Sequence, residues 1–251
     1  MALKTKLWGV RGSIPSPLPP SDVELRIREA LEAFIDLGYG AKEIDKFISS
    51  LPVHKRGGFG GNTPCCEVAS DTTSVLVDGG SGIRRKGLEL MAGPCGKGSG
   101  EVHILMTHFH WDHVIGIPFF VPLFVPRNRI HVYSVQWEAE ETFRVLFRKP
   151  NFPVPYEALG AEIVYHRLEP RVPRTIGDIT FTPYQLDHPD PAWGYRFEHD
   201  GRVMSYAVDT ECTRASREDL GPDLPLYQNV NLLVIDAQYS LPEAIEKVNW
   251  G

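Results

Sequence analysis

Three of the nine histidines in this chain fall within one short segment, and this segment constrains the fold more than any other feature. It runs from His108 to His113, reads HFHWDH, and follows an apolar strand-like run over 102–106. Alternation along a strand puts the first two histidines on one side, and a turn returns the aspartate and third histidine towards them. Imidazole and carboxylate groups are the ligands that zinc-like ions prefer. The candidate metal ligands are His108, His110, Asp112 and His113.

A histidine-rich surface loop is the alternative interpretation of this segment. Such loops usually lie in polar, low-complexity sequence, whereas an apolar strand precedes this segment and an apolar helix, expected over Val114 to Phe120, follows it. The flanking sequence therefore favours a buried metal site. His103, His131 and His166 lie in strand-like sequence elsewhere and are assigned no role.

The length and composition of the chain are those of a packed globular protein. Its 251 residues include 42% hydrophobic and 23% charged residues, and no linker-like stretch divides them. We therefore expect one domain over residues 1–251.

The charge and hydropathy pattern restricts the partners of the chain. The formal net charge is -6, which gives no overall attraction for nucleic acid and leaves only a local basic groove open. The first twelve residues contain no long apolar run, and no stretch is apolar enough to span a membrane. We expect a cytoplasmic protein with a small-molecule substrate and no membrane partner. The sequence leaves open whether the chain forms a homo-oligomer.

The four cysteines predict neither a disulfide framework nor a metal-binding pair. They have neither the density nor the spacing for these roles, so we expect free thiols. Of the adjacent pair at the start of an expected strand, one should point inward. The cysteines are Cys65, Cys66, Cys95 and Cys212.

A helical insertion is expected near the start of the chain. A first strand over Lys4 to Val10 breaks at a Gly-Ser-Ile-Pro turn, and Ser21-Asp22 then resembles a helix cap. A second helix is expected from Ala41 to Ser50, before a glycine-rich loop. We interpret residues 15–57 as an insertion between two strands that serves as a cap or an interface element.

Strands and helices alternate through the remainder of the chain, which predicts mixed layers of both. Helices are expected after Gly82 through Leu90, near Glu138 to Phe147 and from Pro242 to Val248. Strands are expected at Cys66 to Ala69, Thr73 to Val77, Val102 to Met106, Ile130 to Val135, Ile163 to Tyr165, Ile179 to Leu186, Gly194 to Glu198, Val203 to Val208 and Leu232 to Ile235.

Six short motifs together resemble the metallo-β-lactamase superfamily, whose hallmark is His-x-His-x-Asp-His. Within it, the chain resembles the branch that contains the tRNA 3′-processing endonucleases and small phosphodiesterases. The resemblance implies an α+β fold, an αββα four-layer sandwich. The motifs are WGVRGS at 8–13, GGNT at 60–63, DGGSG at 78–82, THFHWDH at 107–113, DHP at 187–189 and YAVDT at 206–210.

The resemblance also implies a role for each candidate site residue. His108, His110 and His188 would bind a first metal, Asp112 and His113 a second, and Asp209 would bridge both. An ordinary polar histidine at 188 and a turn-forming or capping aspartate at 209 are the alternatives. Asp78 would support the ligand histidines, and Asn62 would either donate to the substrate or stabilise its loop.

The sequence departs from the family pattern at its C-terminal end. The family supplies a further histidine to the second metal there, whereas no histidine follows His199 and the sequence ends at Gly251. We expect the last strand and helix of the sandwich to be missing, either by truncation or by a genuine loss of the ligand. Truncation is favoured because Leu232 to Ile235 would otherwise leave apolar surface poorly covered.

The expected function is that of a metal-dependent phosphodiesterase acting on a small nucleotide or cyclic nucleotide. The expected cofactor is Zn²⁺, as one or two ions, with Mn²⁺ or Fe as alternatives. Asp112 would orient the metal-activated attacking water as well as ligate, which makes it the candidate catalytic residue. The alternatives are a thioester or lactone hydrolase of the same fold, and a non-catalytic metal-dependent sensor or binding module.

Overall fold

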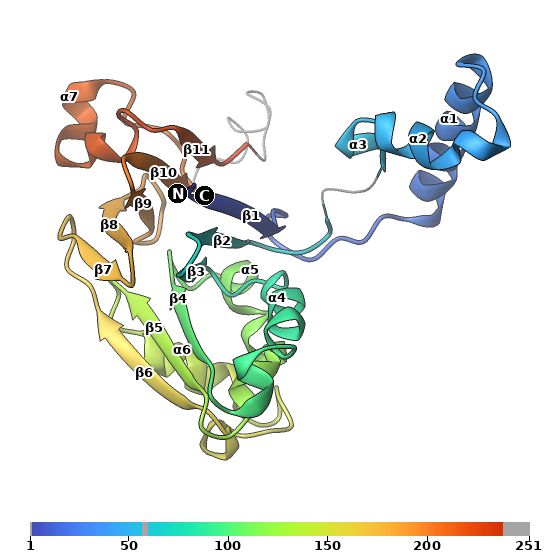
Figure 1. Cartoon of the computed structure of the whole chain (residues 1–251). Helices are drawn as coiled ribbons and strands as arrows, with labels where there is room; N and C mark the ends of the chain where they lie inside the picture. The colour runs from blue at the N-terminus through green and yellow to red at the C-terminus, as the bar shows by residue number, and fades with distance from the viewer. Residues whose placement is uncertain (1, 57–59, 238–251) are drawn as a thin grey trace.

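The computed structural model describes residues 2–56 and 60–237 and contains two β-sheets (Figure 1). The first sheet has six strands in the order β1-β2-β3-β4-β5-β6. β1, β2 and β3 pair antiparallel, and β3 to β6 pair parallel. The strands are β1 (Lys4–Gly9), β2 (Cys65–Ala69), β3 (Ser74–Val77), β4 (Glu101–Leu105), β5 (Arg129–Ser134) and β6 (Glu162–Arg167).

The second sheet has five strands in the order β11-β10-β9-β8-β7. All its pairs are antiparallel except β10 with β11. β7 is not expected from the sequence, because three residues carry too little alternation to be recognised. The strands are β7 (Arg174–Ile176), β8 (Ile179–Gln185), β9 (Trp193–His199), β10 (Arg202–Ala207) and β11 (Leu232–Ile235).

Side-chain alternation in the first sheet builds two cores, one on each face. In β4, Val102 and Ile104 join the cluster beneath the helices, while Leu105 joins the cluster between the sheets. The same alternation divides the adjacent cysteines, so Cys65 packs under the helices and Cys66 packs between the sheets. Both thiols are buried, not one, because a sheet covered on both faces has no outward side.

Helices cover the outer face of each sheet and complete the αββα sandwich. The first sheet is covered by α4 (Ile83–Leu90), α5 (Trp111–Val114), α6 (Ala139–Leu146) and the 3₁₀ turns η2 (Pro94–Lys97), η3 (Ile117–Phe119), η4 (Val121–Phe124) and η5 (Tyr156–Ala158). Phe143 and Phe147 are fully buried in this layer. α7 (Arg217–Leu220) and η6 (Gly221–Leu226) lie beside the second sheet. The expected αββα fold is therefore confirmed.

The helices between β1 and β2 project away from the sandwich, and we call them the arm (Figure 1). They are α1 (Pro20–Asp36), η1 (Ala41–Glu43), α2 (Ile44–Ser50) and α3 (Val53–Arg56). α1 begins at Pro20 after Pro19, without a side-chain cap, so the expected Ser21-Asp22 cap is wrong. Proline suits the first helical turn because that turn leaves its N–H groups unbonded.

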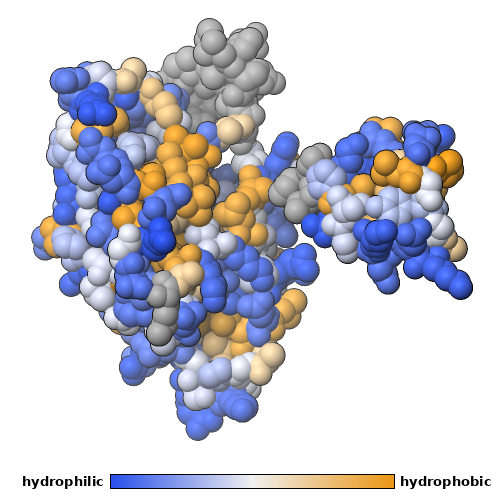
Figure 2. Space-filling model, turned by 45° about the horizontal axis from the view of Figure 1, so that its top comes forward, coloured by the Kyte–Doolittle hydropathy of each residue, from blue (hydrophilic) through white to orange (hydrophobic). Residues whose placement is uncertain are grey.

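The arm packs around a small aromatic cluster and leaves much of its apolar surface exposed. The Phe34 and Phe47 rings meet edge to face with centroids 5.2 Å apart. α1 contains no buried residue, and Leu31 is 58% exposed. Figure 2 shows apolar side chains on the surface of this separate lobe.

The two ends of the arm are joined at a neck beside the sandwich. The Val10 and Arg11 N–H groups both donate to the Asn62 carbonyl, at 2.9 and 3.0 Å. The Ser16 N–H donates to the Gly61 carbonyl at 2.8 Å. The chain therefore leaves and re-enters the sandwich at one place.

Two other sequence expectations concern the ends of the molecule and its relation to membranes. β11 is partly exposed, with Leu232 at 45% and Ile235 at 40%, and the helix expected over 242–248 lies outside the described residues. Among the described helices, none combines the length and apolar character that crossing a membrane requires.

Candidate metal centre

The candidate ligands meet at one edge of the sandwich because several strands end there. His108 and His110 follow β4, His188 follows β8, and Asp209 follows β10. Parallel strands bring their carboxyl ends to the same edge of a sheet, and the two packed sheets bring both sets together.

Two groups of potential ligands form at this edge, and they share one histidine. His108, His110 and His188 make the first group, and His108, His113 and Asp209 make the second. Within each group the ligand atoms lie within 4.8 Å of one another. The shared His108 is 1% exposed, so it lies beneath both groups.

Two buried ring nitrogens in this cluster lack hydrogen-bond partners. The Nε2 atoms of His108 and His188 are both shielded from solvent and unbonded within the described structure. The two ring centroids lie 4.8 Å apart, and those of His108 and His110 lie 4.5 Å apart. Buried polar atoms normally have a partner, so these nitrogens fit a site for a divalent cation.

His113 is held between two carboxylates. Its Nδ1 lies 2.9 Å from Asp78 Oδ2, and its Nε2 lies 2.9 Å from Asp209 Oδ2. Burial lowers the pKa of His113, but these carboxylates outweigh that effect and raise it well above the ordinary value. The site therefore favours positive charge at this position.

Asp78 orients the histidines from beneath the cluster. This fully buried carboxylate accepts hydrogen bonds from the Thr107 N–H and hydroxyl, both at 2.9 Å. Burial raises its pKa, although His113 and Thr107 oppose the shift. These contacts hold Asp78 against the His113 ring and the Thr107 backbone, and its supporting role stays a prediction.

Asp112 and His113 lie in the short helix α5, which begins inside the histidine segment instead of after it. The helix expected over Val114 to Phe120 is wrong, because α5 ends at Val114 and the 3₁₀ turn η3 follows it. Asp112 accepts a hydrogen bond from the Ser13 N–H at 2.9 Å, and its carboxylate lies 3.6 Å from His113 Nε2. It borders the second group without belonging to either.

Asn62 does not point into the cluster. Its side-chain oxygen accepts a hydrogen bond from the Ser81 hydroxyl at 3.1 Å, and Ser81 also accepts one from the Thr63 N–H. These contacts stabilise the loop, which favours the second of the two roles considered for Asn62.

Asp190 also belongs to the cluster, although it is not among the candidate residues predicted from the sequence. Its carboxylate lies 2.8 Å from His110 Nε2, and its carbonyl oxygen lies 2.7 Å from His188 Nδ1. An acidic residue two positions after the histidine of the Asp-His-Pro motif is the available signal. Asp190 therefore contacts both outer histidines of the first group.

Two aspartates at the site have backbones in the left-handed region. Asp78 has φ 64° and immediately follows β3. Asp209 has φ 55° and lies two residues after β10. Aspartate tolerates this region better than most residues do. The reversal turns each carboxylate back towards the histidines.

The loop after β3 clamps the histidine segment and requires glycine. Gly79 N–H donates to the His113 carbonyl at 2.7 Å, and Gly80 N–H donates to the Pro64 carbonyl at 2.9 Å. A Cβ at Gly80 would collide with the Asp112 carbonyl.

Gly80→Ala is expected to displace α5 and to weaken metal binding, because the collision is with rigid backbone. We expect a loss of about 1–3 kcal/mol in unfolding free energy, as for other overpacked sites. Urea unfolding and elemental analysis measure the two effects. Gly201→Ala is the control, because Gly201 has a positive φ but no neighbouring atoms that a Cβ would meet. It should lower the unfolding free energy through backbone strain and leave bound metal unchanged. Unchanged metal content in Gly80→Ala would contradict the clamp.

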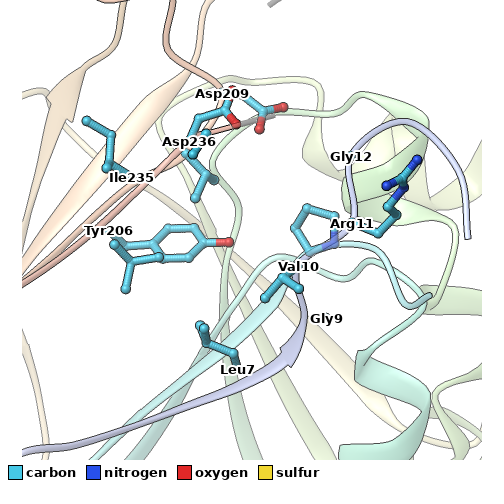
Figure 3. Close-up of a pocket in the computed structure, with 13 residues that line it drawn as sticks. Leu7, Gly9, Val10, Arg11, Gly12, Tyr206, Asp209, Ile235 and Asp236 are labelled. Atoms are coloured by element: carbon cyan, nitrogen blue, oxygen red, sulfur yellow. The ribbon is translucent and has the colours of Figure 1, made fainter. Parts of the chain in front are cut away.

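A pocket beside Asp209 extends from the candidate metal centre towards the neck. Its volume is about 390 Å³, and Tyr206 and Val10 contribute to its lining. Figure 3 shows Asp209 and Asp236 together at the upper side and Arg11 to the right. The pocket thus combines an apolar lining with charges of both signs.

Comparison with known proteins gives relatives in one family. Ribonuclease Z of Staphylococcus epidermidis is 26% identical over 137 residues, which cover 52% of this chain and 40% of that protein. Ribonuclease Z of Thermococcus kodakarensis is 26% identical over 147 residues, which cover 56% and 42%. These matches span about two fifths of the length of the relatives.

The structural and family comparisons agree with the observed fold. The crystal structure of the short form of human tRNase Z matches with a TM-score of 0.50 at 16% identity, over 91% of this chain and 76% of that one. The family model described as "Beta-lactamase superfamily domain" matches residues 73–247, which include all six candidate ligands. The chain therefore belongs to the β-lactamase superfamily, as its histidine segment and αββα sandwich predict.

Proposed function

We propose that this protein is a metal-dependent phosphodiesterase acting on a small nucleotide or cyclic nucleotide. The observation that carries the proposal is the pair of buried, unbonded Nε2 atoms of His108 and His188 beside Asp209. The names of the curated relatives support phosphodiester substrates, and the net charge of -6 favours small ones over long RNA.

The proposed metal is Zn²⁺, as one or two ions, because three imidazoles and a carboxylate match its ligand preference. His108, His110 and His188 would hold the first ion, and Asp112 and His113 would hold a second, with Asp209 between them. When bound, such a metal supplies Lewis acidity and lowers the pKa of a coordinated water.

The other proposed roles belong to side chains around this cluster. Asp112, fixed by the Ser13 N–H, would orient the attacking water and accept its proton. Asp78 would keep the His113 ring in place, and Asp190 would do so for His110. Arg11 would neutralise the phosphate, since no described carboxylate forms an ion pair with it.

A substrate panel tests the proposal. Chelator-treated protein reloaded with Zn²⁺ or Mn²⁺ would be assayed on bis(p-nitrophenyl) phosphate, 2′,3′-cyclic AMP, 3′,5′-cyclic AMP, a precursor tRNA and a thioester. We expect metal-dependent cleavage of the small phosphodiesters. If the precursor tRNA were turned over faster than the small phosphodiesters, in line with the relatives' names, the proposed substrate class would change from small nucleotides to RNA. Metal-loaded protein that cleaves no phosphodiester would refute the proposal.

Arg11→Met is expected to lower kcat/KM for phosphodiesters by about 10- to 100-fold, or about 1.4–2.7 kcal/mol, because it removes a charge-assisted contact. Hydrolysis of the uncharged ester p-nitrophenyl acetate should change little. Arg84→Met, at an exposed position of α4, is the matched control. Equal losses for charged and uncharged substrates would contradict the assignment of Arg11 to phosphate.

A further inference from the structure

A second cluster of metal-binding side chains lies on the first sheet, towards the amino end of β4. Glu101 and His103 lie in β4, His131 in β5 and His166 in β6. The strand register places His103 directly opposite His131 and Tyr133 opposite His166. The candidate metal centre follows the other end of β4, so the two clusters are separate.

Hydrogen bonds to Nδ1 fix the rings of His103 and His131, so that the Nε2 atom of each ring faces the Glu101 carboxylate. His103 Nδ1 lies 3.1 Å from the Tyr133 hydroxyl, and His131 Nδ1 lies 2.7 Å from His166 Nε2. The two Nε2 atoms lie 3.9 and 2.9 Å from Glu101 Oε1. Metal-binding histidines are usually held in this manner, with one nitrogen bonded to the protein and the other facing the ion.

The stacking of the rings makes this arrangement rigid. The His103 and His131 centroids lie 4.9 Å apart with planes 18° from parallel, and His131 stacks on His166 at 5.0 Å. Cross-strand neighbours on a sheet hold such spacings without further support.

The structure leaves one nitrogen of this cluster unsatisfied. His131 Nε2 is shielded from solvent and makes no hydrogen bond in the described residues, since its close contact with Glu101 lacks hydrogen-bond geometry. These two atoms are close enough together to bind one cation side by side, and His103 belongs to the same group of potential ligands.

An open cavity gives an ion access to the cluster. It has a volume of about 610 Å³, and both Glu101 and His103 contribute to its lining. The hydroxyls of Thr72, Ser74 and Thr175 are also on lining residues. Solvent can therefore complete the coordination of an ion held by three protein ligands.

We propose that Glu101, His103 and His131 bind a further Zn²⁺ ion, independent of the candidate metal centre, with His166 as a positioning residue. Two imidazole nitrogens and one carboxylate oxygen suit this ion, and water would fill the remaining position. The ion would link β4 to β5 across the sheet.

Zn²⁺ binding to chelator-treated protein tests the proposal without reference to activity. Elemental analysis after dialysis and calorimetric titration would compare His108→Ala, His108→Ala/Glu101→Gln and His108→Ala/His199→Gln. We expect His108→Ala to retain one Zn²⁺ at the new site, and Glu101→Gln to remove it. His199→Gln should not, because His199 belongs to neither cluster. Circular dichroism confirms folding, and exposed Glu101 makes misfolding a minor risk.

His166→Gln in the His108→Ala background separates a positioning role from a purely structural one. We expect about 10- to 100-fold weaker Zn²⁺ binding with unchanged stoichiometry, because this residue holds the His131 ring without touching the ion. If His108→Ala binds no Zn²⁺, or if adding Glu101→Gln leaves the Zn²⁺ affinity of that variant unchanged, the proposed site at Glu101, His103 and His131 does not exist. Neither result would affect the proposed phosphodiesterase, which is measured by turnover.

Discussion

Replacing His108 with alanine is expected to remove metal from the candidate centre and lower phosphodiesterase activity by about 1000-fold or more, or about 4 kcal/mol in transition-state stabilisation. His108 would hold the first ion and also lies in the group with His113 and Asp209, so its loss should release the first ion and weaken the binding of the second. Initial rates on bis(p-nitrophenyl) phosphate, measured with saturating Zn²⁺, provide the test.

His199→Ala is the matched control for this variant. His199 is also a histidine, but its Nδ1 lies 2.9 Å from the Asp178 carbonyl and it faces neither metal cluster. It should retain activity within a few fold. If His108→Ala retained the activity of the control, the candidate centre would not be the site of the chemistry.

Lys86→Met is expected to lower the unfolding free energy by about 3 kcal/mol, because it leaves a buried carboxylate without its cation. The Lys86 ammonium lies 2.8 Å from Glu67 Oε1, and the two side chains are 7% and 12% exposed. Glu67 also accepts hydrogen bonds from the Trp8 indole and the Ser74 hydroxyl. Urea denaturation of the full chain measures the change.

Two companion variants establish the cause of that loss. Lys86→Met/Glu67→Gln should recover at least about 1 kcal/mol, since the amide keeps an acceptor and removes the unpaired charge. Lys4→Met breaks an exposed pair with Asp71, so it should cost less than about 1 kcal/mol. No recovery in the double variant would mean that Lys86 acts through packing alone.

The same pair gives a pH dependence with a definite sign. Burial raises the pKa of Glu67, but the hydrogen bonds from Lys86, Ser74 and Trp8 outweigh it and leave the pKa below its ordinary value of 4.5. Stability from this group is therefore complete above pH 4.5 and declines as the pH falls through the lower folded-state pKa. The Glu67→Gln variant should show a smaller decline over this range.

The sequence predicts which side chains come together at the candidate centre where those residues follow strands, whereas their roles stay predictions. His108 and His188 each come three residues after the end of a strand, β4 and β8, and the ends of these strands meet at one edge of the two packed sheets. The contact between Asp190 and His110 is harder to predict, because it depends on how one loop folds over another. The Asn62 contact with Ser81 likewise depends on loop geometry that a single sequence does not reveal.

The cluster around His131 is not predictable from the sequence, for a different reason. Its histidines lie far apart along the chain, in three strands whose relative register no single sequence reveals. A shift by one residue would turn any of them to the opposite face of the sheet. Only the paired structure shows that they stack.

The hydrogen bonds at the neck reduce the entropy cost of changing the length of the arm. An insertion pays little extra entropy for added length once its ends are held together, because that cost grows only logarithmically with loop size. Here the Ser16 N–H and the Gly61 carbonyl hold the ends, and no residue of α1 is buried against the sandwich. We therefore expect that the arm can be lengthened, shortened or exchanged without a change in the pairing of β1 with β2.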